Sequence, residues 1–92
     1  MMGFDSNPDK AETNYRKHHV RFTEAEGVFF DDYSLTITDH ESQPDEQRFV
    51  TLGVGRKGRL LVVVYTYRGE DIRIISARVA EPHERKEYEA QL

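Results

Sequence analysis

One apolar hairpin constrains the fold of this chain more than any other feature. Residues Leu60–Tyr67 are almost continuously hydrophobic, which is typical of a central strand covered on both faces. A turn at 68–71 contains the glycine that a tight hairpin requires, and Ile72–Val79 continues as a second strand. This second strand carries Arg73 and Arg78. Because a guanidinium on such a surface stays charged, each arginine needs an anion, either an internal carboxylate or the phosphate or acid of a partner.

Signals elsewhere predict an α+β domain in which helices cover one face of a four-stranded antiparallel sheet. Asn7 before a proline starts one helix, a capping box at Thr23 and Glu26 starts a second, and Pro82 opens a third. Polar and glycine-containing turns separate the strands. The two N-terminal helices, the four strands and the C-terminal helix are expected near residues 8–18, 24–29, 33–38, 48–54, 60–67, 72–79 and 82–90.

Length and composition predict a single domain, residues 1–92, because a second hydrophobic core would not fit in 92 residues. No stretch approaches the roughly 20 apolar residues that span a membrane, and the first residues lack the apolar core of a signal peptide. The absence of cysteine removes disulfides and thiolate metal sites. We therefore expect a protein of the reducing cytoplasm with no membrane attachment.

The net charge of −4 is unevenly distributed along the chain. Residues 1–47 contain eleven acidic residues against four Lys or Arg, a net of −7, whereas residues 48–78 contain two against seven, a net of +5. A local basic segment attracts phosphate-rich partners within a Debye length of about 8–10 Å. The alternative is that these arginines pair internally with the acidic helices.

The ordered set of residues along the chain resembles the BrnT family of toxins from bacterial toxin–antitoxin modules. The segment Ile72–Arg78, followed by Glu84, Arg85 and Tyr88, is the most specific part of this resemblance, which begins at about Phe4. Further matches are Lys10, Asn14, Arg16, Lys17, His18, Val20, Phe22, Glu24, Ala25, Val28, Phe29, Glu46, Arg48, Phe49 and Gly53.

The resemblance implies a RelE-like fold and an endoribonuclease activity that cleaves RNA. It also implies neutralisation by a BrnA-like antitoxin with a ribbon-helix-helix domain, through which the complex contacts its operator DNA. Metal catalysis has no support in the sequence, because there is no cysteine and the histidines lack a spacing such as His-Glu-x-x-His. We expect no metal and no cofactor.

Metal-independent cleavage of RNA needs a base for the 2′-hydroxyl, cations for the phosphate and an acid for the leaving oxygen. The candidate catalytic residues are His18, Tyr65, Arg73 and Arg78. The candidate residues for binding RNA phosphates are Lys17, Arg48 and Arg85.

The main candidates also have structural interpretations. His18 can be a helix C-terminal residue whose positive charge is favoured there, and Tyr65 can be a buried core aromatic. Arg78 can pair with a glutamate of the terminal helix, and Arg73 with Glu84 or an N-terminal acid.

Arg73 and Arg78 are five residues apart, so on an ideally alternating strand they point to opposite faces. A β-bulge between them would bring both to one face, and Ser76-Ala77 is a plausible position for it.

Three residues depart from the family pattern. Ser6 replaces a tryptophan, His19 stands where the family has glycine after Lys-His, and Val79 replaces a Lys or Arg. If the position of His19 needs a positive φ, its side chain introduces strain. Two alternatives to an active ribonuclease stay open, namely a partner-binding remnant that has lost turnover and a non-cleaving RNA- or ribosome-binding module.

Overall fold

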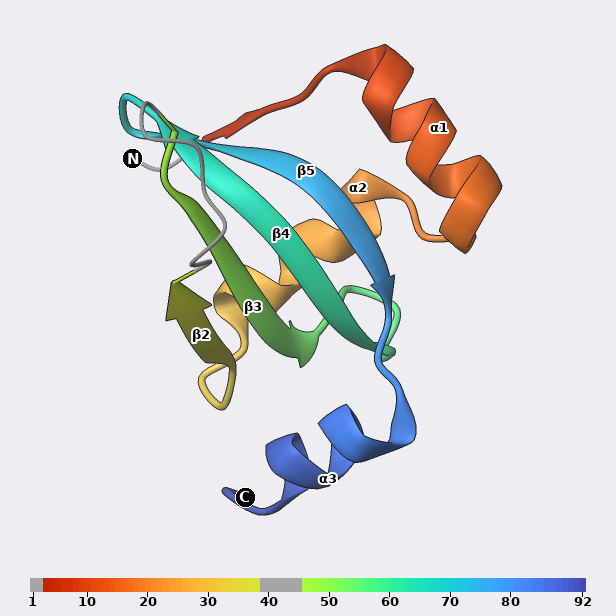
Figure 1. Ribbon diagram of the computed structural model, residues 1–92, viewed down its shortest axis with the longest axis vertical. Helices are drawn as coiled ribbons and strands as arrows, with labels where there is room; N and C mark the ends of the chain where they lie inside the picture. Colours follow the sequence, from red (N-terminus) through yellow and green to blue (C-terminus); the bar gives the residue numbers. More distant parts are fainter. Residues whose placement is uncertain (1–2, 39–45) are drawn as a thin grey trace.

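A twisted five-stranded sheet is the centre of the computed structural model, which describes residues 3–38 and 46–92 of the chain (Figure 1). The strands lie in the order β1-β5-β4-β3-β2, so the apolar β4 occupies the middle of the sheet as its sequence predicts. The strands are β1 (Phe4–Asp5), β2 (Leu35–Thr38), β3 (Arg48–Val54), β4 (Leu60–Arg68) and β5 (Asp71–Val79). The helices are α1 (Pro8–His18), α2 (Phe22–Ala25), the 3₁₀ helix η1 (Glu26–Phe30) and α3 (Pro82–Glu89).

The sheet is mixed, and the expectation of four antiparallel strands is wrong in this respect. Strands β2 to β5 pair antiparallel as predicted, whereas β1 adds a fifth strand parallel to β5, with Phe4 opposite Ile72 and Asp5 opposite Arg73. A strand of two residues has no periodicity to detect in a sequence. Its pairing depends on the open edge of β5, which lies 68 residues further along the chain at Arg73.

Helix α1 begins and ends at the residues that its sequence predicts. The Asn7 side chain accepts hydrogen bonds from the backbone N–H groups of Asp9 and Lys10, and Pro8 occupies the first turn. His19 ends the helix with a φ of 57° and a ψ of 33°, in the left-handed region. The expected positive φ at this non-glycine position is therefore confirmed, and it strains the backbone.

The second helix starts differently from the prediction. Helix α2 begins at Phe22, directly after Arg21, and no side chain caps it, so the expected capping box at Thr23 is wrong. Phe22 is buried, and its packing in the core decides where the helix starts more strongly than a local capping signal does. The core between this segment and the sheet consists of Val20, Phe22, Ala25, Val28, Leu61, Val63, Tyr65, Ile72, Ile74 and Ala77.

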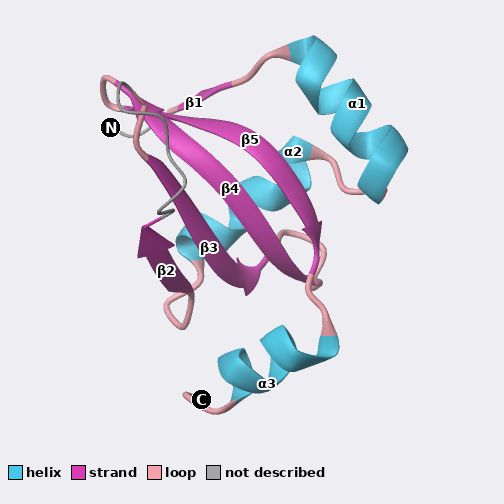
Figure 2. Ribbon diagram, viewed as in Figure 1, coloured by secondary structure: helices cyan, strands magenta, loops and turns pink. Residues whose placement is uncertain are grey.

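Helix α3 packs on the opposite face of the sheet from α2 and η1, so the expectation that all helices lie on one face is wrong. In Figure 2, α2 passes behind the sheet, whereas α3 lies below the ends of its strands. Tyr88 is buried against Leu52, Leu60 and Val62, whose side chains point away from the main core. The Tyr88 hydroxyl donates a hydrogen bond to Oδ2 of Asp31 at 2.6 Å. Burial, together with this carboxylate, raises the pKa of Tyr88 to about 12.

Candidate functional site

A β-bulge in β5 brings Arg73 and Arg78 to the same face of the sheet. The pairing of β5 with β4 shifts register after Tyr65, and Ile75 is left as the extra residue of β5. The insertion reverses the alternation of side chains beyond it. The bulge that would bring both arginines to one face is therefore present, at Ile75, directly before the expected position Ser76-Ala77.

Arg48 lies on this same face, in line with Arg73. Thr66 of β4 stands opposite both residues, and Arg78 stands opposite Val62 further along β4. Since neighbouring strands lie about 4.8 Å apart, the backbones of Arg48 and Arg73 are separated by roughly 10 Å. We call the surface that bears Arg48, Thr66, Arg73 and Arg78 the arginine face.

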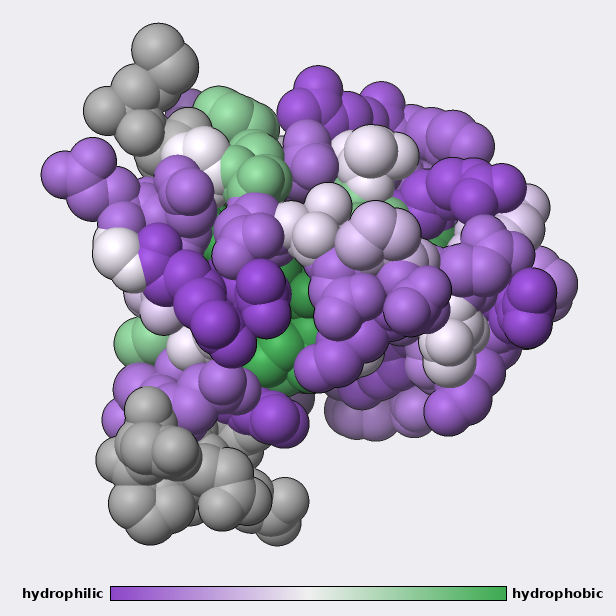
Figure 3. All heavy atoms as spheres, turned by 90° about the horizontal axis from the view of Figure 1, so that it is seen from above, coloured by the Kyte–Doolittle hydropathy of each residue, from purple (hydrophilic) through white to green (hydrophobic). Residues whose placement is uncertain are grey.

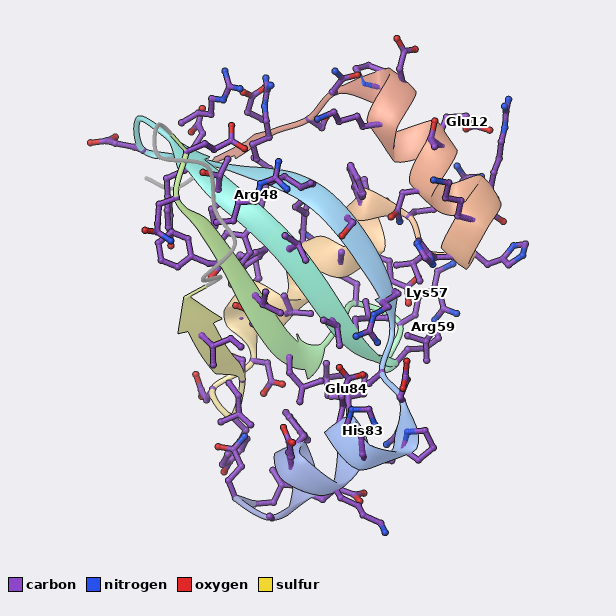
Figure 4. All side chains as sticks on the ribbon, viewed as in Figure 1. Glu12, Arg48, Lys57, Arg59, His83 and Glu84 are labelled. Atoms are coloured by element: carbon purple, nitrogen blue, oxygen red, sulfur yellow. The ribbon has the colours of Figure 1, made fainter. Side chains whose placement is uncertain are left out.

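Arg78 forms a two-pronged ion pair with Glu84, which Figure 4 labels where α3 approaches the sheet. Nη1 and Nη2 of Arg78 donate to Oε1 and Oε2 of Glu84, at 2.8 Å in each case. The Glu84 carboxylate also accepts a hydrogen bond from the backbone N–H of Glu81 at 2.8 Å. Hydrogen bonding from Arg78, assisted by this N–H, lowers the pKa of Glu84 to about 2. Both partners are therefore charged at neutral pH.

The other two arginines of the face also have carboxylate partners. Nε and Nη2 of Arg73 donate to Oδ2 of Asp5 at 3.2 and 2.8 Å, and Nε of Arg48 lies 3.3 Å from Oε1 of Glu46. The alternative interpretation, internal pairing, thus holds for all three arginines. Each guanidinium is nevertheless partly exposed, with 25 to 38% of its side chain accessible.

Two further arginines of the basic segment hold the turn between β3 and β4 against the helices. Arg59 donates to both carboxylate oxygens of the buried Glu24, at 2.7 and 2.6 Å, and this hydrogen bonding lowers the pKa of Glu24. Arg56 pairs with Glu26 at 3.1 Å. These two pairs connect the turn between β3 and β4 to α2 and η1. The basic segment is therefore divided between this structural role and the arginine face.

The C-terminal part of α1 lies beside β5 and forms a shallow hollow of about 170 Å³. Lys10, Lys17 and His18 line it from α1, and Ser76 lines it from β5. Ser76 stands opposite Val64, on the arginine face. The three α1 side chains are exposed and form no ion pair with any described residue. The hollow therefore adds two ammonium groups and an imidazole to the edge of the arginine face.

Tyr65, a candidate catalytic residue, lies on the opposite face of the sheet from the arginines. Tyr65 is 3% exposed, packs in the main core against Phe29 and Phe49, and its hydroxyl forms a hydrogen bond with Thr51 at 2.9 Å. It stands opposite Ile74, so strand alternation places it on the face away from the arginines. Its structural interpretation, a buried core aromatic, fits this position.

Arg85 is also separate from the other candidates. It is exposed on α3, whereas Glu84 and Tyr88 of the same helix face the sheet. The Arg85 side chain forms no hydrogen bond or ion pair with another residue within 3–38 and 46–92. The structure therefore does not bring Arg85 together with Arg73 or Arg78 by a direct interaction.

Several residues near the arginine face were missed in the sequence. Lys10 could have been found, because it lies seven residues before Lys17 on α1 and two helical turns place both on one side. Thr66 and Ser76 had no such signal, since only strand pairing brings them beside the arginines, and Asp5 was anticipated only as an unspecified N-terminal acid for Arg73.

The side of the molecule that faces upward in Figure 1 is largely hydrophilic. Figure 3 shows the molecule from above, where hydrophilic side chains cover most of the visible surface and a small hydrophobic area is exposed between them. Within residues 3–38 and 46–92, no three His, Asp or Glu side chains gather in a way that could hold a metal ion. None of the helices in these ranges is long and apolar enough to cross a membrane.

The fold and this surface define a small α+β domain with arginines across one sheet face and two lysines and a histidine at its edge. The family model described as "Ribonuclease toxin, BrnT, of type II toxin-antitoxin system" matches residues 6–84. The chain therefore belongs to the BrnT family of ribonuclease toxins, and membership of a type II system implies an antitoxin partner.

A solved structure supports the fold. The 1.1 Å crystal structure of the Brucella abortus ribonuclease toxin BrnT is similar with a TM-score of 0.67 and 20% sequence identity, over 88% of this chain and 99% of that chain. At this identity the likeness shows a shared fold. A search of curated proteins found no match.

Proposed function

We propose that this chain is a metal-independent endoribonuclease toxin that binds RNA across the arginine face. The observation that carries the proposal is the position of Arg48, Arg73 and Arg78 on one sheet face, in a chain that belongs to a family of ribonuclease toxins. Guanidinium groups bind phosphate oxygens through paired N–H donors, and several on one face can follow an RNA backbone. A relationship to RelE-type toxins is part of the same proposal.

The chemistry we assign to this surface is attack of a 2′-hydroxyl on the adjacent phosphate. His18 is exposed at the end of α1 and accepts the proton of the 2′-hydroxyl, whose oxygen attacks phosphorus while the bond to the 5′ oxygen breaks. Arg73 and Arg78 stabilise the negative charge that develops on the phosphate. Lys17 holds a neighbouring phosphate, and solvent on this open surface supplies the proton for the leaving oxygen.

The ion pairs of the arginine face are compatible with phosphate binding. A guanidinium has five N–H donors, and a carboxylate occupies only some of them. Nη1 of Arg73 and Nε of Arg78 form no hydrogen bond with any residue that the structure describes. Asp5 and Glu84 therefore hold the arginines in position while leaving N–H groups for a phosphate oxygen.

The proposed partner is a BrnA-like antitoxin with a ribbon-helix-helix domain, which neutralises the toxin and connects the complex to operator DNA. Family membership supports an antitoxin of some kind, and the ribbon-helix-helix class is the additional step. We place the reaction in the cytoplasm, where RNA and a DNA-binding antitoxin meet.

The test is cleavage of a defined, end-labelled RNA by the purified chain in the presence of EDTA. We expect cleavage that leaves 2′,3′-cyclic phosphate ends, and a loss of roughly 10²–10³-fold in rate for Arg73→Ala, as for removal of one group that stabilises developing charge. Asp5→Ala is the matched control, because it breaks the same ion pair and leaves the cation in place. Equal losses in the two variants would assign Arg73 a structural role.

The cleavage assay, together with growth on expression and antitoxin binding, separates the alternatives. Cleavage that disappears with EDTA would contradict metal independence. Intact RNA and unimpaired growth on expression, with tight antitoxin binding retained, would identify a partner-binding remnant. RNA that is bound and never cut would identify a binding module.

A further inference from the structure

A shallow apolar groove lies beside the arginine face, between β2, β3 and α3. Its volume is about 240 Å³. The residues that line it are Leu35, Thr36, Ile37, Val50, Leu52, Val62, Glu84 and Glu87. Ile37 is 64% exposed, which is unusual for a β-branched aliphatic residue in a strand. We call this feature the β2 groove.

The strand that borders this groove is at the edge of the sheet. Strand β2 pairs with β3 on one side, and no strand pairs with its other side within the described residues. Unpaired backbone N–H and C=O groups at a sheet edge are a template for an added strand, and an apolar groove next to the edge selects alternate side chains of that strand. The β2 groove therefore favours an extended peptide over a globular ligand.

The rim of the groove is acidic. Glu84 is already compensated by Arg78, whereas Glu87 has no ion pair with any residue in 3–38 or 46–92. An occupant that places a Lys or Arg beside Glu87 gains a charge interaction that the free chain does not make. A complementary segment is thus apolar at alternate positions and basic at the end that meets α3.

We propose that the β2 groove is the docking site for an extended, basic and apolar segment of the antitoxin, which adds a strand to β2. This inference rests on the proposed function, since it uses the antitoxin partner of that proposal. Protein interfaces typically have an apolar centre and a polar rim, and complementary charges favour one partner, so the apolar lining and acidic rim of the groove suit an apolar and basic segment.

The position of the groove connects docking with neutralisation. Val62 of the groove stands opposite Arg78 in the sheet, and Val50 stands opposite Val64, which in turn stands opposite Ser76. The groove and the arginine face are thus adjacent parts of one sheet face. A segment that occupies the groove and continues across the sheet covers the phosphate-binding arginines and excludes RNA.

The test uses the full chain and the ribbon-helix-helix protein encoded beside it, with affinity measured by isothermal titration calorimetry. We expect Ile37→Lys to weaken binding by at least about tenfold, as for an apolar contact at the centre of an interface. The matched control is Phe30→Lys, because Phe30 is 67% exposed and does not line the groove. Glu87→Lys is expected to weaken binding as well, with the exposed Glu70→Lys on the β4–β5 turn as its control.

RNA cleavage by the free variants distinguishes this inference from the proposed function. Ile37→Lys and Glu87→Lys should cleave RNA at the wild-type rate and escape neutralisation, which supports the groove as the docking site. Variants that cleave RNA and are neutralised like the wild type would overturn the groove and leave the proposed function standing. If the wild-type chain does not bind the ribbon-helix-helix protein, both the proposed antitoxin partner and its docking site in the β2 groove are overturned.

A second copy of this chain is the alternative occupant of the groove, and the oligomeric state tests it. If size-exclusion chromatography with light scattering shows a wild-type dimer that Ile37→Lys converts to a monomer, the groove is a self-association surface and the antitoxin assignment is overturned. A wild-type monomer, together with loss of antitoxin binding in the variant, supports the assignment.

Discussion

Replacement of Asn14 by alanine should destabilise the fold more than a typical substitution in a helix, because its side chain makes three hydrogen bonds to backbone groups outside α1. Asn14 is 5% exposed, and its side chain joins α1 to the edge of β5 in place of a neighbouring strand. Nδ2 donates to the carbonyl oxygens of Ala77 at 2.9 Å and Val20 at 3.0 Å, and Oδ1 accepts the backbone N–H of Ala77 at 3.0 Å. Each of these three backbone groups loses its partner in the variant.

The magnitude follows from the burial of those groups. Ala77 and Val20 are both 0% exposed, so water replaces the lost hydrogen bonds poorly. A buried backbone group without a partner costs about 1–3 kcal/mol, and three such groups at the lower end cost about 3–4 kcal/mol. Alanine recovers about 0.6 kcal/mol because it favours the helix more than asparagine does. We therefore expect a net loss of about 3 kcal/mol, a large fraction of the stability of a small domain.

Two measurements check this expectation. Urea unfolding followed by circular dichroism gives the free energy of unfolding, and amide hydrogen exchange reports on the backbone N–H of Ala77 directly. Thr13→Ala, an exposed neighbour on the same helix, should change the stability by less than about 0.5 kcal/mol. A loss below about 1 kcal/mol for Asn14→Ala, with the Ala77 amide as protected as in the wild type, would refute the reasoning.

Two further predictions concern stability. His19→Gly should raise the free energy of unfolding by about 0.5–1 kcal/mol, because glycine adopts the φ of 57° without strain, and an unchanged urea midpoint would contradict this. Glu84, whose pKa is lowered from 4.5 to about 2, contributes stability that is present above pH 4.5 and is lost as the pH falls towards 2. Glu84→Gln should therefore be less stable at pH 7 by about 1–2 kcal/mol, allowing for the partial exposure of Arg78, and the difference should narrow towards pH 2 in urea titrations. A difference that stays constant between pH 7 and pH 2 would show that the ion pair does not contribute.

Much of the fold was readable from local sequence patterns. The bounds of β3 agree with the prediction, and those of β4 and β5 differ from it by one residue, because hydrophobic runs and the glycines between them depend on neighbouring residues alone. The N-terminal cap of α1 at Asn7 was readable for the same reason, whereas the positive φ at His19 was expected only from the resemblance to the family. Where the core decided the outcome, as for the start of α2 at Phe22, the local signal at Thr23 was misleading.

The candidate site was only partly readable. The sequence pointed to Arg73 and Arg78 as a pair that a bulge could bring to one face, and the structure contains that bulge at Ile75. Tyr65 was grouped with them although alternation along β4 places it in the core. The polar loop expected at 39–45 lies outside the described residues, and the catalytic roles of the candidates stay predictions.

The sequence by itself determined most of the helices and strands and where the chain turns, because each of these depends on residues that are close together along the chain, but it did not show β1 or the start of α2. The ordered set of residues along the chain also indicated the family. The tertiary structure alone decided what each charged side chain meets. Asp5 reaches Arg73 across 68 positions and Asn14 reaches Ala77 across 63, and α3 packs on the face opposite α2 and η1. Such contacts form because packing the core brings distant segments together, and no local pattern specifies which of the many available carboxylates an arginine will find.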